Sequence, residues 1–141
     1  EKIARFFDDK YLYAGLTYSG HALACAAALA TIETYESDGI FENSRRVGTY
    51  LGRRLEELKV RHRSVGDVRY MALFAALEFV TDRATKAPAD LTRLKSFLLE
   101  RGVYVFNFKN VLFIVPPLII SEKELESGLT LLDEGIAELL P

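Results

Sequence analysis

The stretch Tyr13-Ala14-Gly15-Leu16-Thr17-Tyr18-Ser19-Gly20-His21 decides how the rest of the chain is interpreted. Two glycines bracket a run of hydroxyl-bearing and aromatic residues, and an alanine-rich segment, Ala22 to Ala30, follows at once. A loop of this kind, leading directly into a helix, can present backbone N–H groups and hydroxyls to an anion. The residues of this stretch therefore allow an anion-binding loop at the start of a helix.

Composition excludes several classes of partner. The 141 residues suffice for one domain with a sizeable core. Eighteen Lys and Arg against 20 Asp and Glu give a net charge of −2, which argues against a nucleic-acid surface or a polybasic membrane surface. The longest apolar run, Ala22 to Ala30, is far too short to span a bilayer. We expect neither nucleic acid nor membrane as a partner.

The termini and the cysteine content bear on location. Glu1 to Arg5 lacks the apolar core of a secretory signal. The single cysteine, Cys25, excludes an internal disulfide and fits a reducing compartment, so we predict a cytoplasmic protein with Cys25 as a small buried hydrophobic residue. Because the chain lacks an initiating Met and begins within a pattern, we expect a fragment of a longer protein.

Hydrophobic periodicity predicts an α+β fold, a small antiparallel sheet covered by helices. The expected helices cover residues 22–36, 40–62, 89–101 and a stretch from 121 onward, and the expected strands cover 68–80, 103–106 and 111–115. Gly39 and Gly102 are expected to end helices, and Pro116-Pro117 to end the last strand.

The final helix carries the clearest local signals. Ser121 and Glu124 have the spacing of a capping box. Apolar residues then recur every three or four positions and predict a buried stripe: Leu125, Leu129, Leu132, Ile136 and Leu139.

The stretch 13–21 also resembles a signature of class III aminotransferases, which are fold type I enzymes that use pyridoxal 5′-phosphate (PLP). Ala22 stands where the family has a proline, a mild departure at a first helical position. Further resemblances follow in the family's order: Ser64 to Arg69, Leu73 to Glu78, Arg101-Gly102-Val103, and Pro116 to Ser121. Their order and spacing make the chain similar to the C-terminal portion of these enzymes.

The resemblance implies a homodimeric transaminase that moves an amino group from a small-molecule amine or amino acid to a keto acid. In the family, the lysine that binds PLP covalently lies upstream of the region that this chain covers. None of the seven lysines present lies in that motif, so we expect the chain alone to be inactive. Residues 1–21 are then a lead-in with the cofactor-contact loop, and 22–141 the C-terminal α+β domain.

Thr17 is the main candidate for cofactor contact. The matching threonine of the family gives its hydroxyl and backbone N–H to the PLP phosphate, from the subunit that does not hold the lysine. Leu16 is expected to add a second N–H. The alternative is that Thr17 only caps or turns the chain before the helix.

Three other polar residues have a structural and a functional interpretation. For His21 we favour a buried, hydrogen-bonded structural role over catalysis, since no partner for a catalytic base is visible. His62, between two arginines, is expected to be solvated. Arg69 could bind a carboxylate, but an ordinary ion pair is favoured.

The resemblance also implies a substrate pocket with unusual features. Many class III enzymes place a carboxylate-binding arginine at one of two positions that are Phe106 and Phe113 here. Lys109 stands nearby but lacks the bidentate fork of arginine. Tyr70 and Ala72 occupy positions where the family usually has glycines, and would narrow any space left there. We expect a more apolar pocket, or an anion site supplied elsewhere. No residue is assigned to a metal.

Two other functions stay open at this stage. The chain could be a non-catalytic α+β binding or dimerisation module. It could also belong to a class III mutase or epimerase built on the same scaffold.

Overall fold

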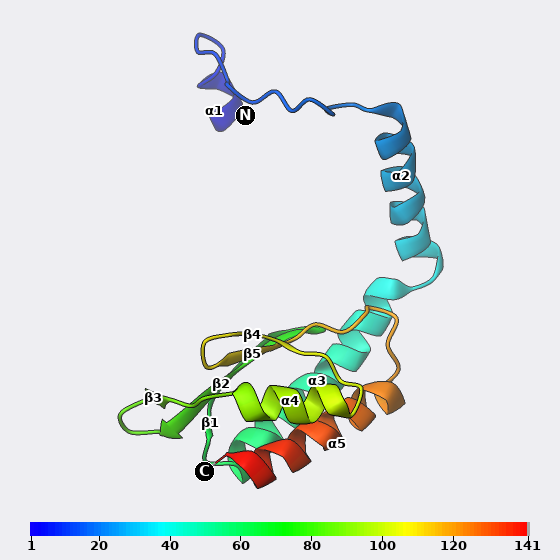
Figure 1. Ribbon diagram of the computed structural model, residues 1–141. Coiled ribbons are helices and arrows are strands. Elements are labelled where there is room, and N and C mark those ends of the chain that lie inside the picture. The colour runs from blue at the N-terminus through cyan, green and yellow to red at the C-terminus, as the bar shows by residue number, and fades with distance from the viewer. Residues whose placement is uncertain (141) are drawn as a thin grey trace. The chain divides into compact units, whose positions relative to one another are not determined.

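The computed structural model describes residues 1–140. From Glu36 onward the chain forms an antiparallel sheet with helices on one face (Figure 1). The strands follow the order β1-β2-β5-β4, and a short β3 also pairs with β2. Glu1–Tyr35 forms a separate unit. The α+β prediction, a small antiparallel sheet covered by helices, is confirmed.

The second unit contains three helices and five strands among the described residues. In chain order they are α3 Ile40–Arg61, β1 Val65–Met71, β2 Phe74–Asp82, β3 Ala87–Pro88, α4 Thr92–Glu100, β4 Phe106–Phe108, β5 Val111–Ile114 and α5 Glu122–Leu139. The first unit holds α1, Lys2–Arg5, and most of α2, Ala22–Ser37.

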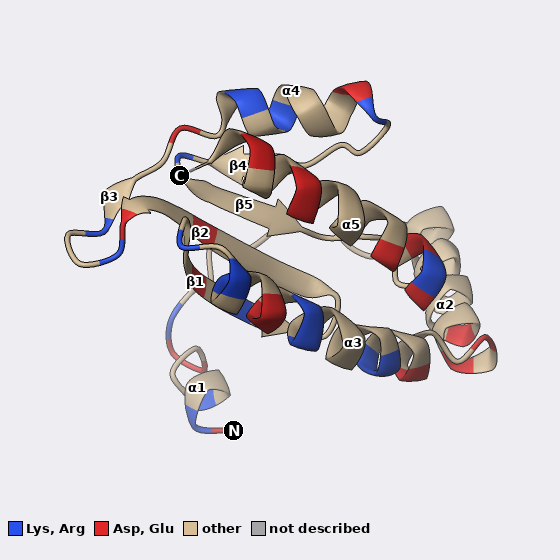
Figure 2. Cartoon of the chain, turned by 90° about the horizontal axis from the view of Figure 1, so that it is seen from below, with Lys and Arg blue, Asp and Glu red and all other residues tan. Residues whose placement is uncertain are grey.

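The core lies between the sheet and the helices α3, α4 and α5. Figure 2 shows these helices in front of the sheet with their charged residues turned outward. Alternate residues of β2, Ala75, Leu77 and Phe79, point to the helices and are buried. On α3 the apolar face is buried from Val47 to Leu58, and Ile40 at the start of the helix is buried as well, whereas Phe41 is half exposed. One side of each element is thus apolar, as the periodicity predicted.

The predicted strand 68–80 is wrong in one respect, because it is a hairpin of two strands. β1 and β2 are joined by a tight turn in which Met71 pairs with Phe74 and Ala72 has a left-handed φ of 51°. Neither turn residue is the glycine or asparagine that usually signals such a turn. Leu73 is buried in the turn and continues the apolar alternation into β2, which is why the sequence looked like one strand.

Close backbone contact explains two glycines of α3. A Cβ added to Gly48 would lie 2.4 Å from the Cα of Ala72, and one added to Gly52 would lie 2.3 Å from the ring of Tyr70. Tyr70 and Ala72, which stand where the resembling family has glycines, are therefore matched here by glycines on the facing helix.

Helix ends follow the local chemistry in detail. The Ser121 side chain accepts a hydrogen bond from the Glu124 N–H, and the Glu124 carboxylate accepts one from the Ser121 N–H, so the predicted capping box is confirmed. Gly102, with φ 81°, follows the end of α4 as predicted. α4 begins at Thr92 rather than at 89, because the Asp90 carboxylate accepts the Thr92 N–H at 3.0 Å.

The bounds of one strand and one burial prediction were wrong. Of the expected strand 103–106 only Phe106 lies in β4, which runs to Phe108. Cys25 is exposed rather than buried, because none of the residues of α2 is buried. The alanine-rich composition of α2 gave it an apolar surface all round, which predicted burial without specifying what would cover it.

Candidate functional site

The loop before α2 turns at residues 17–20 and exposes its polar groups. The Ser19 N–H donates to the Leu16 carbonyl at 3.0 Å, and the His21 N–H donates to the Tyr18 carbonyl at 3.2 Å. Gly20 takes a left-handed φ of 70°. Leu16 and Thr17 are both exposed.

Thr17 and Leu16 offer an unused set of donors. Within residues 1–140, no hydrogen bond is made by the Thr17 hydroxyl, the Thr17 N–H or the Leu16 N–H. Two N–H groups and a hydroxyl on adjacent residues are the donors that a phosphate dianion requires. The loop therefore fits a phosphate-bearing group in donor chemistry.

His21, not Thr17, caps the following helix. The Nδ1 of His21 accepts the Ala24 N–H at 3.4 Å, which satisfies one free donor in the first turn of α2. His21 is hydrogen-bonded as expected, but it is exposed rather than buried.

Three of the predicted pocket residues share the face of the sheet that α3, α4 and α5 leave open. Phe106 and Phe113 are cross-strand partners with ring centroids 5.7 Å apart, and Phe74 stacks on Phe113 at 6.4 Å. Arg69 and Phe113 both line a shallow cavity of about 530 Å³ on this face. The open face is thus an aromatic surface with one arginine at its border.

Arg69 is already engaged by carboxylates. Its guanidinium lies 3.7 Å from Asp67 and 3.5 Å from Glu78. Burial opposes the charge of Asp67, but hydrogen bonds from Lys59 and from the Val68 N–H outweigh it and hold the pKa of Asp67 below its usual value. The ion-pair interpretation of Arg69 is therefore confirmed.

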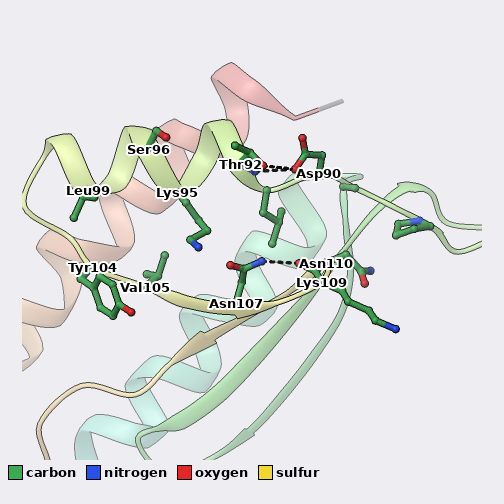
Figure 3. A pocket seen from close by; sticks show the side chains of 13 residues that line it. Asp90, Thr92, Lys95, Ser96, Leu99, Tyr104, Val105, Asn107, Lys109 and Asn110 are labelled. Atoms are coloured by element: carbon green, nitrogen blue, oxygen red, sulfur yellow. Dashed lines mark hydrogen bonds between the residues drawn. The ribbon is translucent and has the colours of Figure 1, made fainter.

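Lys109 lies at the edge of this face. It occupies the β4–β5 turn with a left-handed φ of 52°, and its Nζ lies 5.5 Å from the ring centroid of Phe108, which lines the same shallow cavity as Arg69 and Phe113. Its turn also borders a second cavity, between α4 and the hairpin, but its side chain leads away from that cavity (Figure 3). The structure thus groups Arg69, Phe106 and Phe113, with Lys109 at their edge.

His62 is not solvated, so that prediction is wrong. Its side chain is 11 % exposed, and its Nε2 lies 2.5 Å from a carboxylate oxygen of Asp133 on α5, which also pairs with Arg61. The flanking arginines suggested a surface position. The partner is 71 residues away in the chain and gives no local signal.

A second polar cluster also escaped the sequence analysis. Glu126 on α5 accepts hydrogen bonds from Arg54 at 2.9 Å and from Tyr50 at 2.7 Å, both on α3. The bond from Arg54 is the main reason that the pKa of Glu126 lies below its usual value, and the bond to Glu126 raises the pKa of Tyr50. Like the pair of His62 and Asp133, this cluster joins α3 to α5.

No group of three or more His, Cys, Asp and Glu side chains in residues 1–140 could hold a metal ion. None of the helices described is long and apolar enough to cross a membrane.

Comparison with known proteins places these features in a family context. Residues 1–136 match the family model described as aminotransferase class-III. The chain is 38% identical over 142 residues to adenosylmethionine-8-amino-7-oxononanoate aminotransferase of Methanocaldococcus jannaschii, covering 96% of this chain and 30% of that protein.

A solved structure and a non-transferase relative extend the comparison. The taurine:2-oxoglutarate aminotransferase of Bifidobacterium kashiwanohense, solved with PLP and glutamate, superposes with a TM-score of 0.85 at 32% identity, covering all of this chain and 34% of that one. The isoleucine 2-epimerase of Lentilactobacillus buchneri is 34% identical over 122 residues, which cover 84% of this chain and 27% of the relative. The chain spans about a third of the length of the proteins it matches.

Proposed function

The chain belongs to the class III aminotransferase family, whose cofactor is PLP, and we propose that it is the C-terminal part of a PLP-dependent aminotransferase. The parent protein would transfer an amino group from a small-molecule amine or amino acid to a keto acid. When bound, PLP supplies the electron sink that such a transfer requires. The family match over nearly the whole chain carries this proposal.

Within the parent, we assign Thr17 and Leu16 to the phosphate of PLP. The Thr17 hydroxyl and the two N–H groups have no competing hydrogen bond within the described chain, so the phosphate would displace only water. Charge-assisted bonds of this kind are shorter and stronger than neutral ones. The contact would cross the interface of a homodimer, with the cofactor-binding lysine on the other subunit.

The remaining assignments follow from the same proposal. None of the lysines here lies in a cofactor-lysine motif, so the isolated chain would be inactive. The domain division at residue 21 and the cytoplasmic location remain predictions. The substrate pocket would be lined by Phe106 and Phe113, with Arg69 at the border and Lys109 beyond it. Because Arg69 is paired and the two Phe rings are apolar, this wall would favour a substrate group without charge.

Epimerisation is a second candidate. The similarity to an isoleucine 2-epimerase supports it, since that relative covers most of this chain at 34% identity. Incubating the parent with a chiral amino acid separates the two. A transaminase yields product only when a keto acid is supplied, whereas an epimerase inverts the amino acid without an acceptor.

Replacing Thr17 tests the cofactor assignment. In the full-length parent, Thr17→Ala should weaken PLP binding about 10-fold or more, because it removes a hydrogen bond to a charged group. PLP retained after dialysis is measured by its visible absorbance, and Ser19→Ala is the matched control within the same turn. Equal retention by both variants would refute the role of Thr17, and a parent that never takes up PLP would refute the cofactor itself.

Mixed dimers test whether Thr17 acts across the interface. The Thr17→Ala variant is co-expressed with a copy whose cofactor-binding lysine has been replaced. If the contact crosses the interface, the mixed dimer holds one intact site and regains activity. A mixed dimer without activity would place Thr17 and the lysine of each site in the same subunit.

A further inference from the structure

A cavity on the helix-covered side of the sheet has no role in the proposed transfer. It lies between α4 and the β4–β5 hairpin, with a volume of about 760 Å³ (Figure 3). This size falls within the range of about 300–1,000 Å³ that is usual for pockets that bind small molecules. The aromatic surface with Phe106 and Phe113 lies on the opposite face of the sheet, so the two are distinct.

Lys95 is the residue that distinguishes this cavity. Its side chain leaves α4 and points into the cavity toward β4 (Figure 3). It is half-buried, yet within residues 1–140 its ammonium makes no ion pair and no hydrogen bond. The other partly buried lysine of this unit, Lys59, is by contrast paired with Asp67 at 3.2 Å. A partly dehydrated cation without a counter-charge favours an anion beside it.

The one carboxylate that lines the cavity does not neutralise Lys95. An oxygen of Asp90 accepts both the hydroxyl and the N–H of Thr92, at 2.7 and 3.0 Å. Lys109 borders the cavity through the β4–β5 turn, but its side chain leads away from Lys95 (Figure 3). Of the charged side chains labelled in that view, Lys95 is the one that points into the cavity.

The remaining walls near Lys95 are an amide and an apolar surface. Ser96 and Tyr104 border the cavity with exposed side chains, and the Ser96 hydroxyl lies on the side of α4 away from Lys95 (Figure 3). Asn107 is held in place by donating to the Lys109 carbonyl at 2.6 Å. Leu99 and Val105 add apolar surface that an inorganic ion would leave unused.

We propose that this cavity binds a small organic anion, a phosphate or carboxylate carried on an apolar body, with Lys95 as its counter-charge. The body lies against Leu99 and Val105, and the anionic group lies beside the ammonium of Lys95. Such a ligand would be an accessory one, because the cavity is on the other side of the sheet from the aromatic face.

Three ring compounds that share an apolar body and differ in charge test the proposal: phenyl phosphate, benzoate and benzyl alcohol. Each is titrated into the isotope-labelled 141-residue chain while NMR signals of Lys95, Ser96 and Asn107 are followed. We expect saturable shifts with at least one of the two anions and none with the alcohol. The tighter anion identifies the head group, and signals of Thr17 report separately on binding at that loop.

Lys95→Gln should lower the affinity for the tighter-binding anion about 10-fold or more, whereas Lys123→Gln, at an exposed position of α5, should not change that affinity. Equal binding by Lys95→Gln and the unaltered chain would overturn the proposal. It would also be overturned by benzyl alcohol binding as tightly as the anions, or by shifts confined to Thr17. Backbone spectra of both variants show whether the fold is unchanged.

Discussion

Gly48 on α3 lies directly against Ala72 in the β1–β2 turn, so that a Cβ on Gly48 would come within 2.4 Å of the Ala72 backbone. The neighbouring contact, Gly52 with Tyr70, is just as short but meets the end of a side chain. Backbone in a turn cannot move aside without disturbing the hairpin, whereas a half-exposed tyrosine ring can rotate.

Alanine substitutions at these glycines should therefore have different effects on the free energy of unfolding. Gly48→Ala should lower the free energy of unfolding by about 1–3 kcal/mol, despite the better helix propensity of alanine. Gly52→Ala should be close to neutral. Gly128→Ala on α5, where a Cβ meets nothing within 4 Å, should stabilise by up to about 1 kcal/mol. Urea unfolding measures all three, and equal effects at Gly48 and Gly128 would contradict the contact.

Ala72→Gly should stabilise the protein. Ala72 has a left-handed φ of 51°, which costs an L-residue roughly 1 kcal/mol and costs glycine almost nothing. We expect a gain of up to about 1 kcal/mol in urea unfolding. Ala76→Gly, in the interior of β2, is the control and should destabilise by about 0.5–1 kcal/mol. A loss of stability in Ala72→Gly would count against the turn.

Glu126 should contribute to acid sensitivity. Its pKa is lower in the folded chain than in the unfolded one, mainly through the hydrogen bond from Arg54. Its contribution is therefore present above the ordinary glutamate pKa of about 4.3 and is lost as the pH falls through the lower folded value.

Glu126→Gln should accordingly flatten the loss of stability below about pH 4 and cost about 1 kcal/mol at neutral pH, a modest figure because the carboxylate is partly exposed. Melting temperatures across the acid range measure both effects. Glu134→Gln, at an exposed position of α5, should change neither, and an unaltered acid profile in Glu126→Gln would disprove the linkage.

Asp133→Asn should weaken the attachment of α5 to the end of α3. The substitution removes the charge that pairs with Arg61 and leaves the partly buried His62 with a poorer partner. We expect a loss of about 1–2 kcal/mol in urea unfolding at neutral pH. Glu138→Gln, at an exposed position of the same helix, is the control and should have no effect. An unchanged free energy of unfolding in Asp133→Asn would mean that the pair contributes nothing to stability.

Phe113→Arg should alter substrate choice in the full-length parent. The guanidinium would stand on the aromatic face and could bind a carboxylate in a bidentate manner. We expect kcat/KM for a carboxylate-bearing donor to rise about 10-fold relative to an uncharged amine of similar size. Phe113→Leu should leave that ratio unchanged. A ratio that does not move in either variant would argue against Phe113 lining the substrate site.

Signals carried within a few residues were predictable from the sequence. The capping box at Ser121 and Glu124 and the stop at Gly102 depend on neighbours within one helical turn, and both were correct. The turn at Ala72 was missed because its conformation is held by contact with α3 and not by its own residues. His62 was misjudged for the same reason, since Asp133 decides its environment.

The candidate site, too, has features that the local sequence indicated and features that depend on contacts between distant residues. The residues of the loop indicated donors for an anion, but the choice of Thr17 came from the resemblance to a family. An ion pair was expected for Arg69, and its partners appear only in the structure. The meeting of Phe106 and Phe113 depends on the register of β4 against β5, and the position of Lys109 depends on the turn between them. A periodic pattern gives the face of a residue, but only the register gives its neighbour.

None of the sixteen residues of helix α2 is buried. We therefore expect the isolated polypeptide to self-associate and to bind dyes that report exposed hydrophobic surface. Polar replacements at Leu23, Leu29 and Ile32, which protrude from that helix, are the natural remedy for handling it in dilute buffer.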